Sequence, residues 1–307
     1  MELDSIYCED CLETLGRMLD GSVDCCVTSP PYYGLRDYGV EGQVGLEETP
    51  EQYVGKLVTI FKEVRRVLKD DGTLWLNLGD SYNSHSTGKG NVGGIEGNRK
   101  NKIDNTANTH RGSGIAKDKD LLGIPWMVAF ALRADGWYLR QDIIWHKPNP
   151  MPESVTDRCT KAHEYIFLLS KSQRYYYDVD VIKEKCNWNG KSGAKNYDWE
   201  NDGRKHNTNQ KPIEKRNKRS VWTVNTQSYK KAHFATFPEK LIVPCIKAGC
   251  PDGGVVYDPF MGAGTTALVA HKLNRKFIGS ELNPEYVKIA EKRLEPYMTQ
   301  TKIFDNI

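Results

Sequence analysis

The sequence contains no long hydrophobic run. Within its 307 residues, no apolar stretch approaches the roughly 18 residues that a membrane-spanning helix needs. The amino end, Met1 to Asp4, is acidic and lacks the basic and then apolar order of a secretory signal. We therefore expect a cytoplasmic protein that has no membrane partner.

The eight cysteines lack the arrangement of a metal site. Cys8 and Cys11 have the CxxC spacing, but no second CxxC and no paired histidines follow at the distance typical of a zinc finger. Thiols stay reduced in the cytosol, and free cysteines are often buried. The sequence therefore predicts free thiols, several of them in the core, and no bound metal.

The net charge is only +3, but the charge is unevenly distributed. Residues 171–231 hold 15 lysines and arginines against 7 acidic residues, whereas the rest of the chain holds 28 against 33. Eight aromatic residues lie in the same basic segment. Cations interleaved with aromatic rings suit the phosphates and bases of a nucleic acid. A solvated insert is an equally good interpretation of this feature taken alone.

Segments with the patterns of strands and helices alternate along the chain. Strands are expected at 6–8, 23–28, 73–78, 141–145, 165–169, 255–257 and 276–279. Helices are expected from the Thr49 cap to 70–72, over 125–133, from Pro238, over 265–273, and over 284–294 behind an Asn283 cap. This alternation predicts an α/β fold with parallel strands.

A glycine-rich segment, 258–266, lies between an expected strand and an expected helix. Glycines there allow a tight turn, and a helix N-terminus offers unpaired N–H groups to a ligand. Gly262, Gly264 and Ala267 fit the pattern GxGxxG/A, and Glu281 ends the next strand, where a carboxylate can accept ribose hydroxyls. The segment predicts a nucleoside-containing cofactor, and NAD and S-adenosylmethionine both remain open.

A second motif, Thr28-Ser29-Pro30-Pro31-Tyr32, follows a buried strand. The two prolines make a rigid turn at the carboxyl edge of the sheet, where α/β folds place ligands. The Ser29 hydroxyl and nearby carbonyl groups could accept hydrogen bonds from an amino group, while Tyr32 could stack on the ring that bears it. Taken alone, Pro-Pro-Tyr is more often a simple turn.

Together the two motifs resemble those of the beta-class amino DNA methyltransferases. That family carries (D/N/S)PP(Y/F/W), here 29–32, upstream of FxGxG, here 260–264, with a target-recognition region between them. The similarity covers nearly the whole chain, because 7–10 resembles a segment that supplies an acid to the cofactor's adenine and 234–240 resembles the motif before the glycines.

The resemblance implies a Rossmann-like α/β fold dependent on S-adenosyl-L-methionine, with a circularly permuted motif order. It divides the chain into a catalytic half at 1–170 and a basic, aromatic target-recognition region at 171–231. The remainder, 232–307, is the cofactor-binding half of the same methyltransferase domain. Residues 83–119 hold seven glycines and six asparagines, which predicts a mobile loop within the catalytic half.

The resemblance also implies roles for individual residues. The catalytic residues are Ser29, Pro30, Pro31 and Tyr32, which hold the amine of a flipped base and stack on its ring. The cofactor-binding residues are Asp10, Thr28, Thr236, Phe237, Pro238, Asp258, Phe260, Gly262, Gly264, Thr265 and Glu281. The basic residues expected to contact DNA are Lys89, Arg99, Arg111, Lys191, Arg204, Lys215, Arg216 and Arg219.

The target base is expected to be cytosine, methylated at N4. Many adenine-modifying relatives have lysine at the position of Phe237. Position 29 holds serine, where the family motif can also have aspartate or asparagine. Both differences favour cytosine, and adenine N6 stays open as the alternative. Methylation of a ring carbon would need a nucleophilic cysteine, and Cys245 is expected in the core. The remaining alternatives are an NAD-dependent oxidoreductase and a catalytically inactive DNA-binding protein.

The expected partner is double-stranded DNA, in a bacterial or phage-encoded enzyme that works at the nucleoid. Members of the family often dimerise and often accompany a restriction endonuclease. A homodimer and a cognate endonuclease are therefore options that the sequence leaves open.

Overall fold

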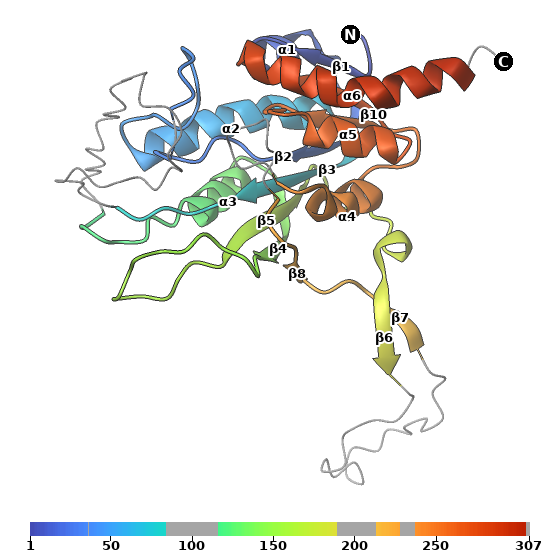
Figure 1. Cartoon of the computed structure of the whole chain (residues 1–307). Helices are drawn as coiled ribbons and strands as arrows, with labels where there is room; N and C mark the ends of the chain where they lie inside the picture. Colours follow the sequence, from blue (N-terminus) through green and yellow to red (C-terminus); the bar gives the residue numbers. More distant parts are fainter. Residues whose placement is uncertain (36, 84–115, 189–212, 228–236, 305–307) are drawn as a thin grey trace.

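The computed structural model describes the chain except for residues 36, 84–115, 189–212, 228–236 and 305–307. Among the described residues, eight strands form one central sheet in the order β1-β10-β9-β2-β3-β5-β4-β8 (Figure 1). The strands are β1 Ser5–Tyr7, β2 Val23–Thr28, β3 Leu68–Leu78, β4 Tyr138–His146, β5 His163–Ser170, β8 Val221–Thr223, β9 Val255–Asp258 and β10 Lys276–Ser280. The helices are α1 Cys11–Arg17, α2 Pro50–Val67, α3 Ile124–Ala134, α4 Glu239–Gly249, α5 Thr265–Lys272 and α6 Pro284–Phe304.

The sheet is parallel from β1 to β3 and mixed beyond it. Strands β1, β10, β9, β2 and β3 pair in parallel, whereas β5 runs antiparallel to both β3 and β4. This architecture confirms the expected Rossmann-like α/β fold. Strands β2 and β9 are neighbours, so the segments that follow them emerge at the same edge of the sheet. These segments are the two sequence motifs, although about 230 residues separate them along the chain.

Alternating side chains give the sheet two apolar faces. In β3, Leu74 and Leu76 pack with α1, α2 and α3, while Trp75 between them packs on the other face with α4 and α5. All three side chains are buried. A strand that is covered on both faces must be apolar on both, which explains the nearly continuous hydrophobic runs in the sequence. The result is a sheet between two layers of helices.

Several elements differ from the sequence-based expectation. Helix α1 was not expected, although Asp10 is a good N-cap and its side chain accepts a hydrogen bond from the Leu12 N–H. Strand β3 begins at Leu68, so residues 70–72 lie inside it instead of ending helix α2. Helix α6 continues well past Leu294. Strand β2 and the capping box of α2, formed by Thr49 and Gln52, match the prediction.

The expected recognition region is only partly described. Strand β8, which lies within 171–231, pairs with β4 in the central sheet. Strands β6 Glu184–Trp188 and β7 Ile213–Arg216 form a separate antiparallel ladder that projects away from the sheet (Figure 1). The three-part division of the chain remains a prediction. Most of the expected loop at 83–119 lies outside the described residues.

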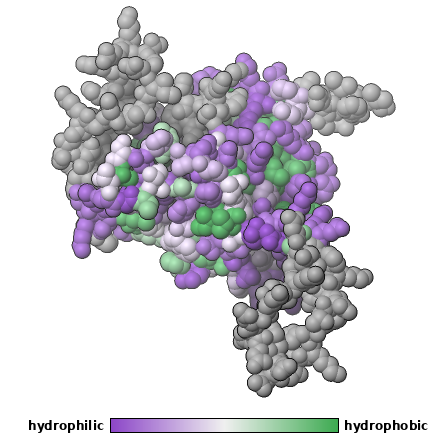
Figure 2. Space-filling model, turned by 60° about the horizontal axis from the view of Figure 1, so that its bottom comes forward, coloured by the Kyte–Doolittle hydropathy of each residue, from purple (hydrophilic) through white to green (hydrophobic). Residues whose placement is uncertain are grey.

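One face of the molecule is largely polar. Figure 2 shows a face on which hydrophilic side chains predominate and hydrophobic ones gather in small groups. None of the described helices combines the length and the apolar character needed to cross a membrane.

Candidate active site

The turn after β2 is held rigidly against its neighbours. The Tyr53 hydroxyl of α2 donates a hydrogen bond of 2.8 Å to the Pro31 carbonyl. The ring of Tyr32 lies against Gly79, where an added Cβ would come within 2.5 Å of the ring. The prolines fix the backbone, and these contacts fix the aromatic side chain. The turn is therefore preorganised before any ligand binds.

The glycine-rich loop after β9 is closed by the predicted ribose acid. Gly262 has a φ of +53°, and its N–H donates to Glu281 Oε2 at 2.7 Å. The other carboxylate oxygen accepts from the Asn283 N–H at 2.8 Å. Burial raises the pKa of Glu281, while these backbone donors oppose the rise. The geometry sets a mostly buried carboxylate beside the turn of the loop.

The buried side chain of Asp258 links the two motifs by hydrogen bonds. Its carboxylate accepts hydrogen bonds of 2.6 Å from the hydroxyls of Thr28 and Thr266 and one of 3.0 Å from the Phe260 N–H. Burial raises the pKa of Asp258 to about 6, against the effect of these donors. Thr28 ends β2 and Thr266 lies in the first turn of α5. The carboxylate therefore connects the end of β2, where the Ser29–Tyr32 turn begins, with the start of α5.

One cavity of about 300 Å³ lies between the two motifs. The predicted residues that line it are Asp10, Ser29, Pro30, Pro31, Tyr32, Phe237, Phe260, Gly262, Thr265 and Glu281. A turn suited to an amine and a loop suited to a nucleoside thus open into the same space. This convergence is the geometry expected for transfer between two bound molecules.

Four predicted cofactor residues do not reach the cavity. Thr28 and Asp258 bind each other in the core, and Pro238 is the buried N-cap of α4. Gly264 has a φ of +75° and begins α5, where an added Cβ would lie 2.8 Å from the Cβ of Ala290. The structure gives these residues a supporting position instead of a place on the wall. Thr236 lies outside the described residues.

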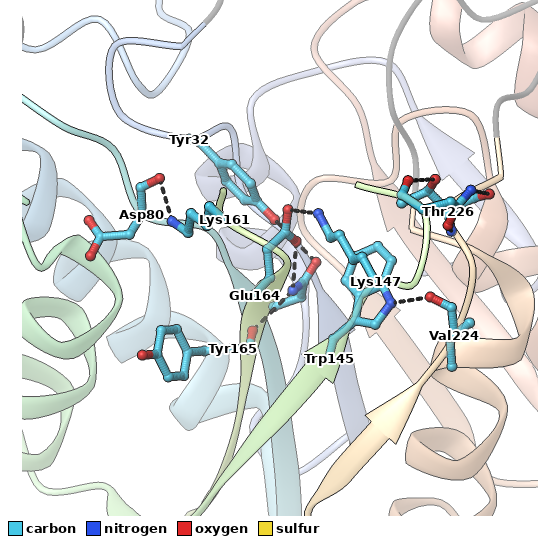
Figure 3. A network of polar contacts seen from close by, with 11 residues as sticks. Tyr32, Asp80, Trp145, Lys147, Lys161, Glu164, Tyr165, Val224 and Thr226 are labelled. Carbon is cyan, nitrogen blue, oxygen red and sulfur yellow. Dashed lines mark hydrogen bonds and ion pairs between the residues drawn. The ribbon is translucent and has the colours of Figure 1, made fainter. Parts of the chain in front are cut away.

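Sequence reasoning missed a polar cluster on the cavity wall, formed by Asn77, Trp145, Lys147 and Glu164. The Tyr32 hydroxyl donates to Glu164 at 2.8 Å, and Lys147 forms an ion pair with the same carboxylate (Figure 3). The signal available in the sequence was weak. Glu164 is a single acid near the start of β5, and it lies 132 residues from Tyr32.

The predicted DNA contacts are described for only three residues. Lys215 and Arg216 lie in β7, and Arg219 follows it. Arg216 and Arg219 both form ion pairs with Glu184 of β6. The other predicted contacts, Lys89, Arg99, Arg111, Lys191 and Arg204, lie outside the described residues.

The buried thiols are unsuited to nucleophilic chemistry. Cys245 is 1% exposed in α4, as expected, and burial raises its pKa. Burial likewise raises the pKa of Cys25 and Cys26 well above that of a free thiol. A mechanism through a covalent cysteine adduct has no support in these residues.

Comparison with known proteins identifies the family. Residues 23–292, most of the chain, match the family model for DNA methylases of the N6/N4 type. The chain belongs to this DNA methylase family. The family match confirms the expectation of an amino-DNA methyltransferase. It replaces the alternative of an NAD-dependent oxidoreductase.

Individual relatives agree with this assignment. The chain is 48% identical over 293 residues to the type II methyltransferase M.Cfr9I of Citrobacter freundii, covering 93% of this chain and 86% of the relative. It is 48% identical over 280 residues to the type II methyltransferase M.SmaI of Serratia marcescens, covering 90% and 86%.

Solved structures share the fold at low sequence identity. The cytosine-N4-specific PvuII DNA methyltransferase superposes with a TM-score of 0.63 and 21% identity, covering 93% of this chain and 84% of that one. A Thermus thermophilus protein described as a DNA modification methylase, solved with S-adenosyl-L-methionine, has a TM-score of 0.60 and 21% identity, covering 95% and 93%.

Proposed function

We propose that this DNA methylase transfers a methyl group from S-adenosyl-L-methionine to the exocyclic N4 of cytosine in duplex DNA. The observation that carries the proposal is the shared cavity. The Ser29–Tyr32 turn and the loop closed by Glu281 both line this one cavity. The amine acceptor and the nucleoside site are therefore adjacent.

The turn holds the target amine. The Ser29 hydroxyl and the Pro30 carbonyl accept hydrogen bonds from it, which directs the nitrogen lone pair toward the cofactor site. Tyr32 stacks on the flipped base. Its ring is already held in place by the close contact with Gly79. Positioning and electrostatic support for the charge that develops on nitrogen lower the barrier.

The cofactor side of the cavity fits S-adenosyl-L-methionine, which supplies an electrophilic methyl group. Glu281 is a half-buried carboxylate on the cavity wall, and ribose hydroxyls are suitable donors to it. Phe260 and the Gly262 turn would hold the methionine part, and Asp10 would accept a hydrogen bond from the adenine amine. Gly264 and Asp258 act indirectly, by holding the loop and the helix start in place.

Cytosine is the favoured base on two grounds. Serine occupies position 29, and the PvuII methyltransferase, which shares the fold, is named as cytosine-N4-specific. Adenine N6 is the second candidate, since the same turn can hold either amine. The type II methyltransferases among the relatives favour a cognate restriction endonuclease as partner, and the homodimer is a further option.

The test is to incubate the protein with S-adenosyl-L-methionine and unmethylated duplex DNA, digest the DNA and identify the nucleosides by mass spectrometry. We expect N4-methylcytosine. N6-methyladenine would keep the mechanism and overturn the base. No methylated nucleoside, with cofactor binding verified by calorimetry, would support an inactive DNA-binding protein or an RNA substrate.

A matched variant separates catalysis from binding. Tyr32→Ala removes the stacking ring and its hydrogen bond to Glu164. We expect turnover to fall by about 100-fold or more while the dissociation constant for S-adenosyl-L-methionine stays within about twofold. A parallel loss of cofactor affinity would contradict the assignment of Tyr32 to the base.

A further inference from the structure

The cavity has one cationic side chain among its described lining residues, Lys147. Four acids also line it, and one of them, Glu164, pairs with Lys147. The two side chains are only 17% and 13% exposed. A lysine so nearly removed from water on a ligand-facing wall needs hydrogen-bond acceptors for its three donors.

Two strands hold this ion pair in place. Lys147 directly follows β4, and its N–H donates to the Ala162 carbonyl at 2.8 Å just before β5 begins. Its ammonium lies 4.4 Å from the centre of the Trp145 ring, and Trp145 pairs with Glu164 across the ladder. The position of Lys147 is therefore set by the sheet and by an aromatic face, and not by an exposed loop.

The same carboxylate fixes the stacking residue. Glu164 Oε2 accepts from the Tyr32 hydroxyl at 2.8 Å and from Asn77 Nδ2 at 3.3 Å, while Oε1 faces Lys147 (Figure 3). Among the described residues, Glu164 is the hydrogen-bonding partner of the Lys147 ammonium. This bond uses one of the three N–H donors of Lys147. The other two donors are available to a ligand in the cavity that Lys147 and Tyr32 both line.

We propose that Lys147 reads the acceptor edge of the flipped base, and that Glu164 positions Lys147 and Tyr32 as one unit. This inference rests on the proposed function. In cytosine and adenine, the ring nitrogen beside the amine-bearing carbon is an acceptor. In thymine and guanine, the ring nitrogen beside the carbonyl carries a hydrogen and would oppose the ammonium. Lys147 thereby selects amino bases over keto bases and serves cytosine N4 or adenine N6 equally.

The first test is the variant Lys147→Met, which keeps an unbranched side chain, one atom shorter, and removes its donors. Methyl transfer at saturating cofactor should fall roughly 10- to 100-fold, the loss expected for one charged hydrogen bond. The dissociation constant for S-adenosyl-L-methionine should not change. Lys69→Met is the matched control, because Lys69 lies in β3, forms an ion pair with Asp24 and does not line the cavity.

The decisive test removes the acceptor from the base. The methylated site is first mapped on plasmid DNA treated with the wild-type enzyme, and the target cytosine in a duplex oligonucleotide is then replaced by 3-deazacytosine. The wild type should lose roughly 10- to 100-fold in rate, whereas Lys147→Met should lose nothing further. If the mapped base is adenine, 1-deazaadenine serves as the analogue.

Additive losses from the variant and the analogue would overturn the proposal, as would an unchanged rate in Lys147→Met. If Lys147→Met melts at a lower temperature than the wild type, Lys147→Arg replaces it: this variant keeps donors and should still discriminate between cytosine and the analogue. A wild-type enzyme that methylates no natural DNA would refute the proposed function itself, which is a separate outcome.

Discussion

Asp258 shows how a residue can serve a site without touching the ligand. Its carboxylate binds Thr28 on the catalytic side and Thr266 and the Phe260 N–H on the cofactor side. It is 1% exposed, so its hydrogen bonds are hardly weakened by water. Sequence reasoning placed Asp258 in contact with the cofactor, because the chain order alone does not distinguish a wall residue from one beneath the wall.

The raised pKa of Asp258 predicts a pH dependence of stability. The unfolded carboxyl ionises near 3.8, whereas burial delays ionisation in the folded state to about pH 6. Between these values the folded state binds more protons, so the free energy of unfolding falls as the pH rises. Relative to Asp258→Asn, the wild type should lose about 2 kcal/mol between pH 4 and pH 6, measured by urea denaturation.

The comparison with Asp258→Asn isolates this carboxyl. Burial also raises the pKa of Glu281, which adds a slope of the same sign to both proteins. The difference between the two curves removes this contribution except for the part of the Glu281 shift that the Asp258 charge itself causes. A difference that is flat from pH 4 to pH 6, or that rises with pH, would show that Asp258 ionises normally in the folded protein.

The glycine loop and helix α5 depend on a close approach to helix α6. Gly264 has a φ of +75°, and a Cβ there would lie 2.8 Å from that of Ala290. Gly264→Ala should lower the free energy of unfolding for two reasons. Placing alanine in a left-handed conformation costs about 1–2 kcal/mol, and crowding of its Cβ against Ala290 costs about 1–3 kcal/mol more. Denaturation in urea measures the sum.

Gly253→Ala is the control for the backbone contribution. Gly253 has a φ of +72°, but nothing lies within 4 Å of an added Cβ. This variant should show only the left-handed penalty of about 1–2 kcal/mol. Equal losses in the two variants would mean that α6 moves away from α5 without cost, and that Gly264 is present only for its backbone conformation.

The sequence predicted these elements where local signals are strong. Strand β2 and the capped start of α2 match, since a continuous apolar run and a Thr-Pro-x-Gln cap are local features. The Asp70–Gly72 run looked like a helix end, but pairing with β2 at Leu68 extends β3 through it. Strand β8 has three residues, and only its pairing with β4 defines it.

The candidate site likewise has a part that the sequence predicted and a part that it did not. Ser29–Tyr32 and Glu281 stand in recognisable motifs, and the structure brings them to one cavity. Lys147 and Glu164 stand in no motif that the chain order displays. Their association depends on the register of β4 and β5, in which Trp145 faces Glu164, and side-chain pairing across a ladder is not encoded by local sequence.

The whole molecule makes one site from two distant parts of the chain. Strands β2 and β9 are neighbours in the sheet, so the catalytic turn and the cofactor loop meet regardless of which motif comes first in the sequence. Parallel strands share a carboxyl edge, and ligands bind there. The permuted motif order therefore leaves both motifs at the same edge of the sheet, and the predicted recognition region lies between them in the sequence.

The β6–β7 hairpin carries the described part of the predicted DNA surface. Glu184 forms ion pairs with Arg216 and Arg219, whose side chains are 41% and 67% exposed. A phosphate that binds these arginines competes with that carboxylate. Glu184→Gln should therefore raise DNA affinity, whereas Arg219→Ala should lower it and reduce the slope of log affinity against log salt by roughly one.

Fluorescence anisotropy with a labelled duplex over a salt series measures both quantities. Lys276→Ala is the control for net charge: Lys276 begins β10, at the edge of the sheet opposite the active site, and is 54% exposed. Its removal should leave the slope unchanged, because only phosphates within contact distance release counterions. If Arg219→Ala and Lys276→Ala gave the same slope, the hairpin would contribute only general charge, and DNA would bind elsewhere along the carboxyl edge.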